Sequence, residues 1–378
     1  KFEVKNFKGF EDWFVIDFSE TKDYQFNTEC INNAVINKAI IYGANGSGKS
    51  NLGYAIFDII SHLTDKRHDT GCYINYLNAN RDTELAEFKY TFKFKDNHIV
   101  EYSYGKLDKS TLSYESLKIN NELVVSFDRR MTTKAEINLE GAENLNTDIG
   151  DSKISVINYI KNNTILVNNT INEVFSQFVE FIDGMLFFRS LDDNSYLGFE
   201  VGSGKVGEDI IKHDNLADFQ DFLNQAGVEC KLTTIEYKGE KTLAFKFNKK
   251  VIYFYEVAST GTKSLALFYY WYQRLKEDSK VTFVFVDEFD AFYHHALSRL
   301  IVSRLKEISA QVIITTHNTS VMTNDLLRPD CYFLMDNEKI KPASQCTEKE
   351  LRVAHNLEKM YKAGSFNAGL LRSELQKA

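Results

Sequence analysis

Eight residues near the N-terminus have the types and spacing of a phosphate-binding loop. They run Gly43-Ala44-Asn45-Gly46-Ser47-Gly48-Lys49-Ser50 and follow the apolar segment 39–42. Glycines allow the backbone to turn its N–H groups inward around phosphate oxygens, and a helix that begins there adds the positive end of its dipole. We therefore expect a strand, this loop and then a helix, with the loop holding the phosphates of a nucleotide.

Separate side chains of this loop have separate expected roles. Lys49 can reach the β- and γ-phosphate oxygens of ATP, and the hydroxyl of Ser50 can bind Mg²⁺. The candidate nucleotide-binding residues here are Gly43, Asn45, Gly46, Ser47, Gly48, Lys49, Ser50 and Asn51. The alternative is a Gly-rich turn that ends in Lys-Ser by chance, and the motifs farther along the chain weaken it.

Two acidic residues follow a second apolar segment. Residues 281–286 are all β-branched or aromatic, which is typical of a strand buried on both faces of a parallel sheet. Asp287 can hold Mg²⁺ through water, and Glu288 can orient and polarise the water that attacks the γ-phosphate. Many strands end in acidic residues, so this pair alone is moderate evidence for a catalytic site. The phosphate-binding loop in the same chain strengthens that interpretation.

A histidine follows a third apolar segment, 311–316. His317 at this place can donate a hydrogen bond to the γ-phosphate and so distinguish ATP from ADP. A purely structural histidine is the alternative, but the position after the Asp-Glu strand favours a catalytic role. Together the three stretches predict a protein that binds and hydrolyses ATP with Mg²⁺.

The order of these motifs resembles that of ABC-type ATPases, in the branch that includes the SMC, RecF and OLD proteins. Residues 259–263 are similar to the signature motif of this family at Ser259 and Gly261. The resemblance implies that two copies enclose ATP, with Ser259 and Gly261 of one copy capping the γ-phosphate held by the other. It also identifies Asp290 as the aspartate that bridges the two sites.

Two further family features concern the surroundings of the nucleotide. The segment Lys5–Phe10 is similar to the start of SMC- and OLD-like ATPases, which implies that Lys8 lies near the nucleotide. A glutamine loop, which would add a contact to Mg²⁺, is not recognisable in the sequence.

The resemblance implies an α/β fold with a β-rich N-terminal lobe and a largely parallel sheet flanked by helices. We expect an N-terminal ATPase lobe at 1–105, an inserted mixed α/β arm at 106–250 and a C-terminal ATPase lobe at 251–378. The insertion is expected because Lys49 and Ser259 must fold into one head although 210 positions separate them. The arm contains no heptads and no Cys-x-x-Cys, which excludes long coiled-coil arms and zinc hooks.

The last part of the chain is expected to be helical. Residues 347–350, Thr-Glu-Lys-Glu, match a capping box, and apolar residues follow at helical spacing as far as Tyr361. No nuclease domain is expected after His317.

Composition favours a cytoplasmic protein. The chain has 378 residues, a formal charge of −8 and five scattered cysteines, and no segment suits a membrane span or a secretion signal. The acidic balance argues against general coating of duplex DNA. The densest basic stretch, 238–250, is interpreted as the solvated face of a strand, with DNA contact as the less favoured alternative.

Two functions remain. The favoured one is an ATP-dependent regulatory or sensor subunit that forms a homo-oligomer, an ATP-sandwich dimer or an assembly of such dimers, and controls a separate effector. This follows from resemblance to stand-alone ATPase subunits of two-component phage-defence, or abortive-infection, systems, in which the effector is a nuclease or toxin. The alternative is a RecF-like clamp for DNA repair or recombination. A transporter subunit is disfavoured by the long insertion.

Overall fold

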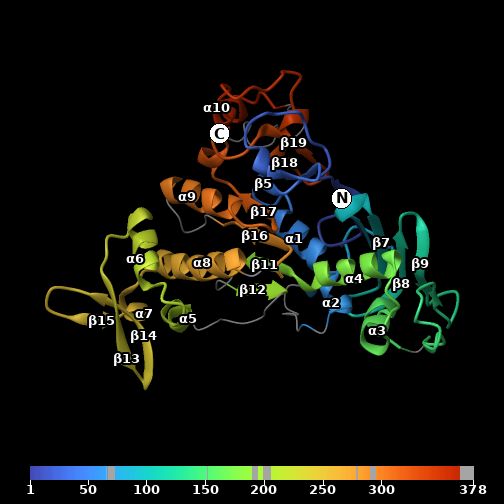
Figure 1. The fold of residues 1–378 in the computed structure, drawn as a ribbon. Coiled ribbons are helices and arrows are strands. Elements are labelled where there is room, and N and C mark those ends of the chain that lie inside the picture. The colour runs from blue at the N-terminus through green and yellow to red at the C-terminus, as the bar shows by residue number, and fades with distance from the viewer. Residues whose placement is uncertain are drawn as a thin grey trace.

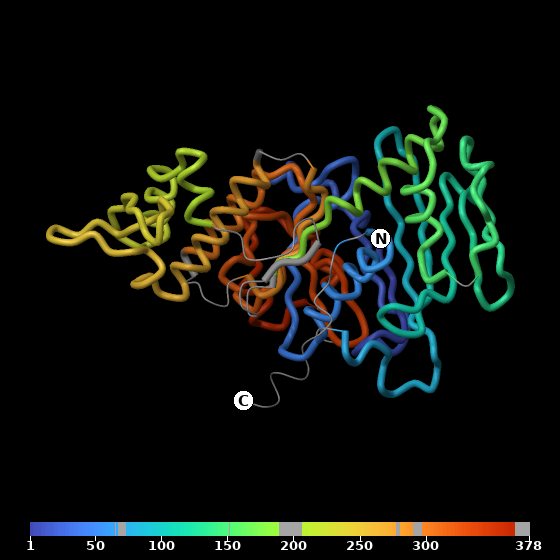
Figure 2. Tube along the Cα trace, turned by 90° about the horizontal axis from the view of Figure 1, so that it is seen from below, coloured from blue at the N-terminus to red at the C-terminus, as the bar shows by residue number. Residues whose placement is uncertain are grey.

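The computed structural model describes residues 1–64, 66, 73–150, 152–189, 195–198, 206–277, 280–289 and 295–366. Two seven-stranded sheets and one three-stranded sheet organise this part of the chain. The antiparallel sheet and the three-stranded sheet lie at opposite ends of the molecule, and the central sheet lies between them (Figure 1). Figure 2 shows the same arrangement from below.

The central sheet is largely parallel, with the strand order β12-β11-β16-β17-β5-β18-β19. Its strands are β5 (Lys38–Gly43), β11 (Met185–Arg189), β12 (Ser195–Gly198), β16 (Phe283–Asp287), β17 (Gln311–Thr316), β18 (Tyr332–Met335) and β19 (Ile340–Pro342). The five inner strands run parallel and the two edge strands antiparallel. This architecture confirms the expected α/β class.

Helices cover both faces of the central sheet. Successive side chains of one strand point to opposite faces, so neighbouring residues contact different helices. Phe187 of β11 packs on Tyr54 and Phe57 of α1 (Lys49–Phe57), with ring centroids 5.6 and 5.1 Å apart. The next residue, Phe188, packs on Trp271 of α8 (Thr260–Glu277) at 5.2 Å. The helix that starts at the phosphate loop and the helix that starts at the signature thus lie on opposite faces.

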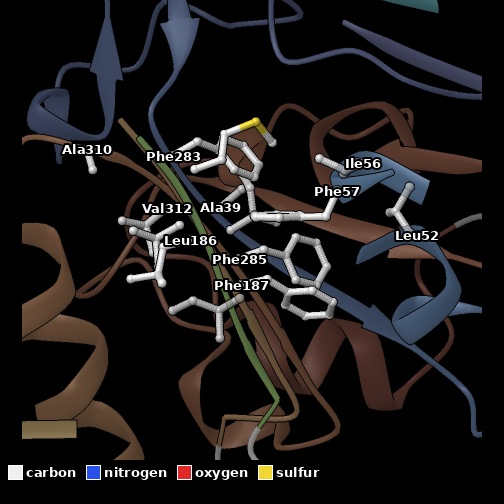
Figure 3. Packing of buried hydrophobic residues seen from close by; sticks show 14 of the residues in the cluster. Ala39, Leu52, Ile56, Phe57, Leu186, Phe187, Phe283, Phe285, Ala310 and Val312 are labelled. Carbon is white, nitrogen blue, oxygen red and sulfur yellow. The ribbon is translucent and has the colours of Figure 1, made fainter. Parts of the chain in front are cut away.

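A glycine brings α1 close to the sheet. A Cβ on Gly53 would lie 2.8 Å from the ring of Phe187 and 2.9 Å from that of Phe285. Figure 3 shows these two rings beside Leu52, Ile56 and Phe57. The contact fixes the height of α1, and with it the phosphate loop, above the strands.

The second large sheet is antiparallel, with the order β10-β9-β8-β7-β6-β1-β2. Its strands are β1 (Phe2–Lys5), β2 (Phe14–Ile16), β6 (Ala86–Lys93), β7 (Ile99–Lys106), β8 (Leu112–Ile119), β9 (Glu122–Asp128) and β10 (Glu136–Ile137). Helices α2 (Ile60–Leu63), α3 (Val156–Asn163) and α4 (Thr170–Asp183) pack near it, as with Phe92 on Phe178 and Phe181.

The three-stranded sheet consists of β13 (Leu232–Tyr237), β14 (Glu240–Lys246) and β15 (Val251–Tyr253). It packs with α5 (Val206–Lys212), α6 (Leu216–Gln225) and α7 (Phe254–Val257), and α5 and α6 contact α8. The lysines of the basic stretch 238–250 are all exposed.

The remaining elements are one long helix, α9, and several short strands, turns and helices. They are β3 (Ile31–Asn32), β4 (Val35–Ile36), α9 (His295–Lys306), α10 (Leu357–Lys362) and the 3₁₀ turns η1 (Thr28–Cys30), η3 (Lys95–Asn97), η4 (Thr319–Val321), η5 (Pro329–Cys331) and η6 (Ala343–Gln345). Within the described ranges, no helix has the length and apolar character needed to cross a membrane.

The segment expected as one inserted arm, 106–250, is divided among all three sheets. Strands β8 to β10 continue the antiparallel sheet of the N-terminal lobe, because β8 pairs with β7 along its length. Strand β11 enters the central sheet beside β16. Among the described residues of this segment, only the region from α5 to β15 forms a sheet separate from both large sheets. Residue 105 therefore does not mark a boundary between sheets.

The expected C-terminal helix begins later than the sequence indicates. The Thr347 hydroxyl accepts a hydrogen bond from the backbone N–H of Lys349, which forms a local turn in place of a helix cap. Helix α10 starts at Leu357, and the Asn356 side chain caps it by accepting from Lys359 N at 2.8 Å. The expectation of a helix from the capping box at 347–350 was therefore wrong.

Candidate functional site

The phosphate-binding loop connects β5 to α1. Gly46 and Gly48 have φ angles of 79° and 91°, which L side chains rarely adopt. A Cβ on Gly43 would lie 2.5 Å from the Ser47 hydroxyl and 2.7 Å from the carbonyl oxygen of Met335. The three glycines are therefore required by backbone conformation or by close approach.

The loop leaves polar groups available for a ligand. The Ser47 hydroxyl is buried and has no hydrogen-bond partner within the described residues. Gly48 stands at the N-terminus of α1, where backbone N–H groups have no partners in their own helix. An orphaned hydroxyl and helical N–H groups at the positive end of the helix dipole suit a polyphosphate.

Lys49 bends back onto its own loop in this structure. Its ammonium group donates to the carbonyl oxygens of Gly43 at 2.8 Å and Ala44 at 3.1 Å. It also lies 3.0 Å from Nε2 of His317. Because an ammonium group can only donate, this contact makes Nε2 the acceptor and places the imidazole proton on Nδ1.

The acidic pair at the end of β16 is held by Thr315 of the adjacent strand β17. The buried Thr315 hydroxyl donates to Oδ1 of Asp287 at 2.7 Å and accepts from the backbone N–H of Glu288 at 2.7 Å. Glu288 has a φ of 45°, and this left-handed conformation turns the chain sharply at the end of the strand. One hydroxyl thus fixes both the candidate metal ligand and the backbone of the candidate base.

His317 completes the group. Its Nε2 lies 3.5 Å from Oε1 of Glu288, and the imidazole is about half-exposed. The next residue, Asn318, donates to the Ser298 hydroxyl of α9 at 3.1 Å and caps η4, which ties the end of β17 to the adjacent helix.

Ser259 and Gly261 lie at the start of α8, apart from the group formed by Lys49, Glu288 and His317. The Ser259 hydroxyl accepts from the backbone N–H of Thr262 at 3.1 Å and lies 2.9 Å from its hydroxyl. Helix α7, which directly precedes Ser259, contacts β14 and β15 of the outlying three-stranded sheet. In Figure 1 this junction lies toward that sheet, whereas α1 lies in the middle of the molecule. Ser259 and Gly261 are thus separate from Lys49 of the same chain.

Other expected residues are placed as follows. Lys8 has a φ of 48° and lies 5.5 Å from the ring of Tyr54 on α1. The amide of Asn51 lies close to Gly9 of the same N-terminal turn, 3.2 Å from where its Cβ would be. Asp290 lies outside the described residues.

The protein would supply few of the ligands that bind Mg²⁺. No cluster of three or more His, Cys, Asp or Glu side chains suited to a metal occurs in the described ranges. Ser50 and Asp287 offer the oxygen donors that Mg²⁺ prefers, and this ion commonly takes its other ligands from phosphates and water. The donor set therefore fits a nucleotide-bound Mg²⁺.

Sequence reasoning missed two residues of the site. Thr315 was recognised only as part of the strand before His317, although a hydroxyl at the end of a buried strand is a signal for a polar contact there. Met335 closes the loop from β18: its carbonyl oxygen approaches Gly43, and its methyl carbon would lie 3.4 Å from a Cβ on Gly48. No sequence pattern indicates this second contact.

Comparison with known proteins gives one family match. Residues 38–323 match the family described as "AAA domain, putative AbiEii toxin, Type IV TA system". This range contains the phosphate loop, Ser259 and Gly261, and the strands β16 and β17 that precede Glu288 and His317. No curated protein sequence is significantly similar to the chain.

Several solved structures are distantly similar. An SmcHead bound to the C-winged helix domain of ScpA is 19% identical, with 90% of this chain and 95% of that chain covered and a TM-score of 0.45. An Smc head domain with an extended coiled coil, bound to the C-terminal domain of ScpA from Pyrococcus furiosus, is 15% identical, with coverages of 96% and 97% and a TM-score of 0.44. The recombination mediator protein RecF-ATPrS is 13% identical, with coverages of 90% and 96% and a TM-score of 0.36.

Proposed function

The chain belongs to the AAA-domain family described as putative AbiEii toxin, Type IV TA system, and from this premise we propose that it is an ATP-driven regulatory subunit. Two copies enclose ATP, and the closed assembly controls a separate effector, a nuclease or toxin, in defence against phage. The observation that carries the ATPase part is the meeting of Lys49, Glu288 and His317 from three adjacent parallel strands or the loops that follow them.

This meeting follows from the sheet topology. Strands β16, β17 and β5 are neighbours and parallel, so their carboxyl ends lie at one edge. Ligands of open α/β sheets bind at that edge. The arrangement supports a site in which acid, base and phosphate-binding groups act on one γ-phosphate.

The chain's own residues divide the work of phosphoryl transfer. The loop N–H groups and Lys49 bind the phosphates, which requires the Lys49 ammonium to leave the carbonyl oxygens of its own loop. Ser50 and Asp287 hold Mg²⁺, which, when bound with ATP, neutralises charge on the phosphates. Glu288 orients the attacking water and accepts its proton. His317 donates to the γ-phosphate, which requires Lys49 to leave Nε2 and that atom to carry a proton.

The second copy completes the site in this proposal. The separation of Ser259 and Gly261 from Lys49 of the same chain supports capping of the γ-phosphate by the signature of the other copy. Asp290 would then bridge the two sites. The effector part of the proposal rests on the family description, which names a toxin–antitoxin system.

Glu288→Gln tests the catalytic assignment. The variant should bind ATP, accumulate a closed oligomer measurable by light scattering, and lose hydrolysis. Lys49→Ala should instead lose nucleotide binding and remain in the open form. Normal turnover by Glu288→Gln would refute the role given to Glu288.

Mixing two inactive variants tests the shared site. Lys49→Ala and Gly261→Asp each leave a homodimer without an intact composite site. In a heterodimer, the intact loop of one copy faces the intact signature of the other, so an equal mixture should regain up to about a quarter of wild-type activity, as random pairing of a two-fold dimer allows. No recovery, with both variants folded and shown to exchange subunits, would argue against sharing.

The effector is sought by purifying the chain at native expression, with its neighbouring genes intact and ATP present, and identifying bound proteins by mass spectrometry. A stoichiometric nuclease or toxin supports the regulatory role. Recovery with DNA and repair proteins alone supports the clamp alternative.

A further inference from the structure

A cavity lies at the opposite end of α1 from the phosphate loop. Its volume is about 360 Å³, within the range of small-molecule sites. Residues from the junction of α1 and α2, the β7–β8 turn and the start of α3 line it, among them Ser61, Lys106, Lys109, Lys153 and Ser155. None of these residues takes part in the proposed ATPase site.

The cavity is positively charged although the chain is acidic. Its lining includes three lysines and, among the described residues, Asp58 as the only carboxylate. The ammonium groups of Lys109 and Lys153 make no ion pair or hydrogen bond within the described part of the chain. The formal charge of the whole chain is −8, so a local excess of lysine charge marks a place suited to an anion.

The floor of the cavity is a buried ion pair. Lys106 donates to Oδ2 of Asp58 at 2.7 Å and to the Ser61 hydroxyl at 2.5 Å, and both charged side chains are 1% exposed. Tyr104 also donates to Oδ2 of Asp58, at 3.0 Å. Burial lowers the pKa of Lys106. Removing both charges from water is costly, and a buried ion pair with a shifted lysine pKa at the floor of a cavity is a candidate functional feature.

The start of α3 forms one wall of the cavity. The Ser155 hydroxyl caps this eight-residue helix by accepting from the N–H groups of Ile157 and Asn158, and it donates to Oε2 of Glu115 at 2.6 Å. Glu115 lies buried behind the cap and does not line the cavity. Oε1 of Glu115 also accepts from the backbone N–H of Val156 at 2.7 Å, so the first N–H groups of α3 already have partners and the positive charge of the cavity comes from its lysines.

We propose that this cavity binds a phosphorylated small molecule whose phosphate oxygens pair with Lys109 and Lys153. Tyr73 offers an aromatic wall for the remainder of the ligand. The two ends of α1 then serve two ligands, because Lys49 begins the helix in the phosphate loop and Asp58 follows its last residue at the cavity floor. This site does not depend on the proposed effector or on ATP hydrolysis.

Calorimetric titration tests the site in a Lys49→Ala background, which weakens phosphate binding at the loop. The probes are inorganic pyrophosphate and, separately, AMP and GMP. Lys109→Ala/Lys153→Ala should weaken binding of at least one probe by about tenfold or more, since hydrogen bonds to charged groups are being removed. The matched control is Lys118→Ala/Lys134→Ala, two exposed lysines of the same lobe that do not line the cavity.

The outcomes are distinct. Saturable binding that depends on Lys109 and Lys153 and survives in the control supports the site, and tighter binding of a nucleotide than of pyrophosphate identifies a nucleoside as part of the ligand. Absence of binding at millimolar concentrations of every probe overturns the proposal. An equal loss in both double variants also overturns it, because it indicates general attraction to lysines.

Discussion

Thr315→Val isolates the hydroxyl that connects the two acidic residues of the proposed catalytic site. Valine has nearly the shape of threonine, so packing within the central sheet is kept while both hydrogen bonds are lost. Oδ1 of Asp287 loses its donor, and the backbone N–H of Glu288 loses its acceptor. The left-handed backbone of Glu288 then lacks the contact that holds it.

The size of the effect follows from burial. Thr315 is fully buried, and an unsatisfied buried polar group costs about 1–3 kcal/mol, with the larger values for charged groups. Because the two contacts share one hydroxyl and are not additive, we expect the free energy of unfolding to fall by about 2–4 kcal/mol. A shift of about 1 Å in a catalytic group can cost about 100-fold in rate, so kcat should fall about 10- to 100-fold.

The assay combines steady-state ATP hydrolysis, equilibrium ATP binding and urea unfolding. Thr315→Val should lower kcat while the Kd for ATP changes little, and it should cause no further loss in a Glu288→Gln background. Thr315→Ser keeps the hydroxyl and should keep kcat near wild type, although the lost methyl group costs about 1 kcal/mol of stability. If Thr315→Val folds and retains kcat within about twofold, the reasoning fails.

Two further predictions concern buried lysines. Burial lowers the pKa of Lys38, which donates to the carbonyl oxygen of Ala310 at 2.6 Å, to about 8 from 10.5. Between these pH values the unfolded chain binds the extra proton. The free energy of unfolding of the wild type should therefore rise by about 2 kcal/mol between pH 7.5 and pH 10, relative to Lys38→Met, as measured by urea unfolding at pH 7.5, 9 and 10. Parallel curves for the two proteins would contradict this. Lys106→Met leaves Asp58 buried without its cation and should lower the free energy of unfolding by about 3–5 kcal/mol, and adding Asp58→Asn should restore part of the loss. A double variant no more stable than Lys106→Met alone would contradict the assignment of that loss to the unpaired carboxylate.

The features that could be read from the sequence are those set by local chemistry. The phosphate loop was recognisable because glycine adopts φ angles of 79° and 91°, as at Gly46 and Gly48, far more readily than residues with a side chain. The hairpin of β6 and β7 follows from alternating side chains around Asp96 and Asn97, both of which have positive φ. Residues 281–286 and 311–316 read as buried strands because both faces of a parallel sheet are covered.

The features that could not be read depend on pairing at a distance. Nothing in residues 112–128 indicates that they extend the N-terminal sheet, because any strand edge offers the same backbone groups to a partner. The contact of Thr315 with Asp287 depends on the register of β17 against β16, in which Val286 pairs with Ile314. The helix predicted from the capping box at 347–350 does not form there, because a threonine hydroxyl can stabilise a local turn as readily as a helix cap.

The position of β5 in the central sheet has a consequence for synthesis of the protein. Its two hydrogen-bonded neighbours are β17 (Gln311–Thr316) and β18 (Tyr332–Met335), whose first residues follow Lys38 by 273 and 294 positions. Until both have left the ribosome, β5 has two open edges, and the carbonyl oxygen of Met335 that approaches Gly43 does not yet exist. Long-range pairing of this kind folds slowly and exposes unpaired edges to aggregation. A nascent or prematurely terminated chain that stops before Met335 therefore carries the whole phosphate-loop sequence without the two strands that flank β5 in the folded protein.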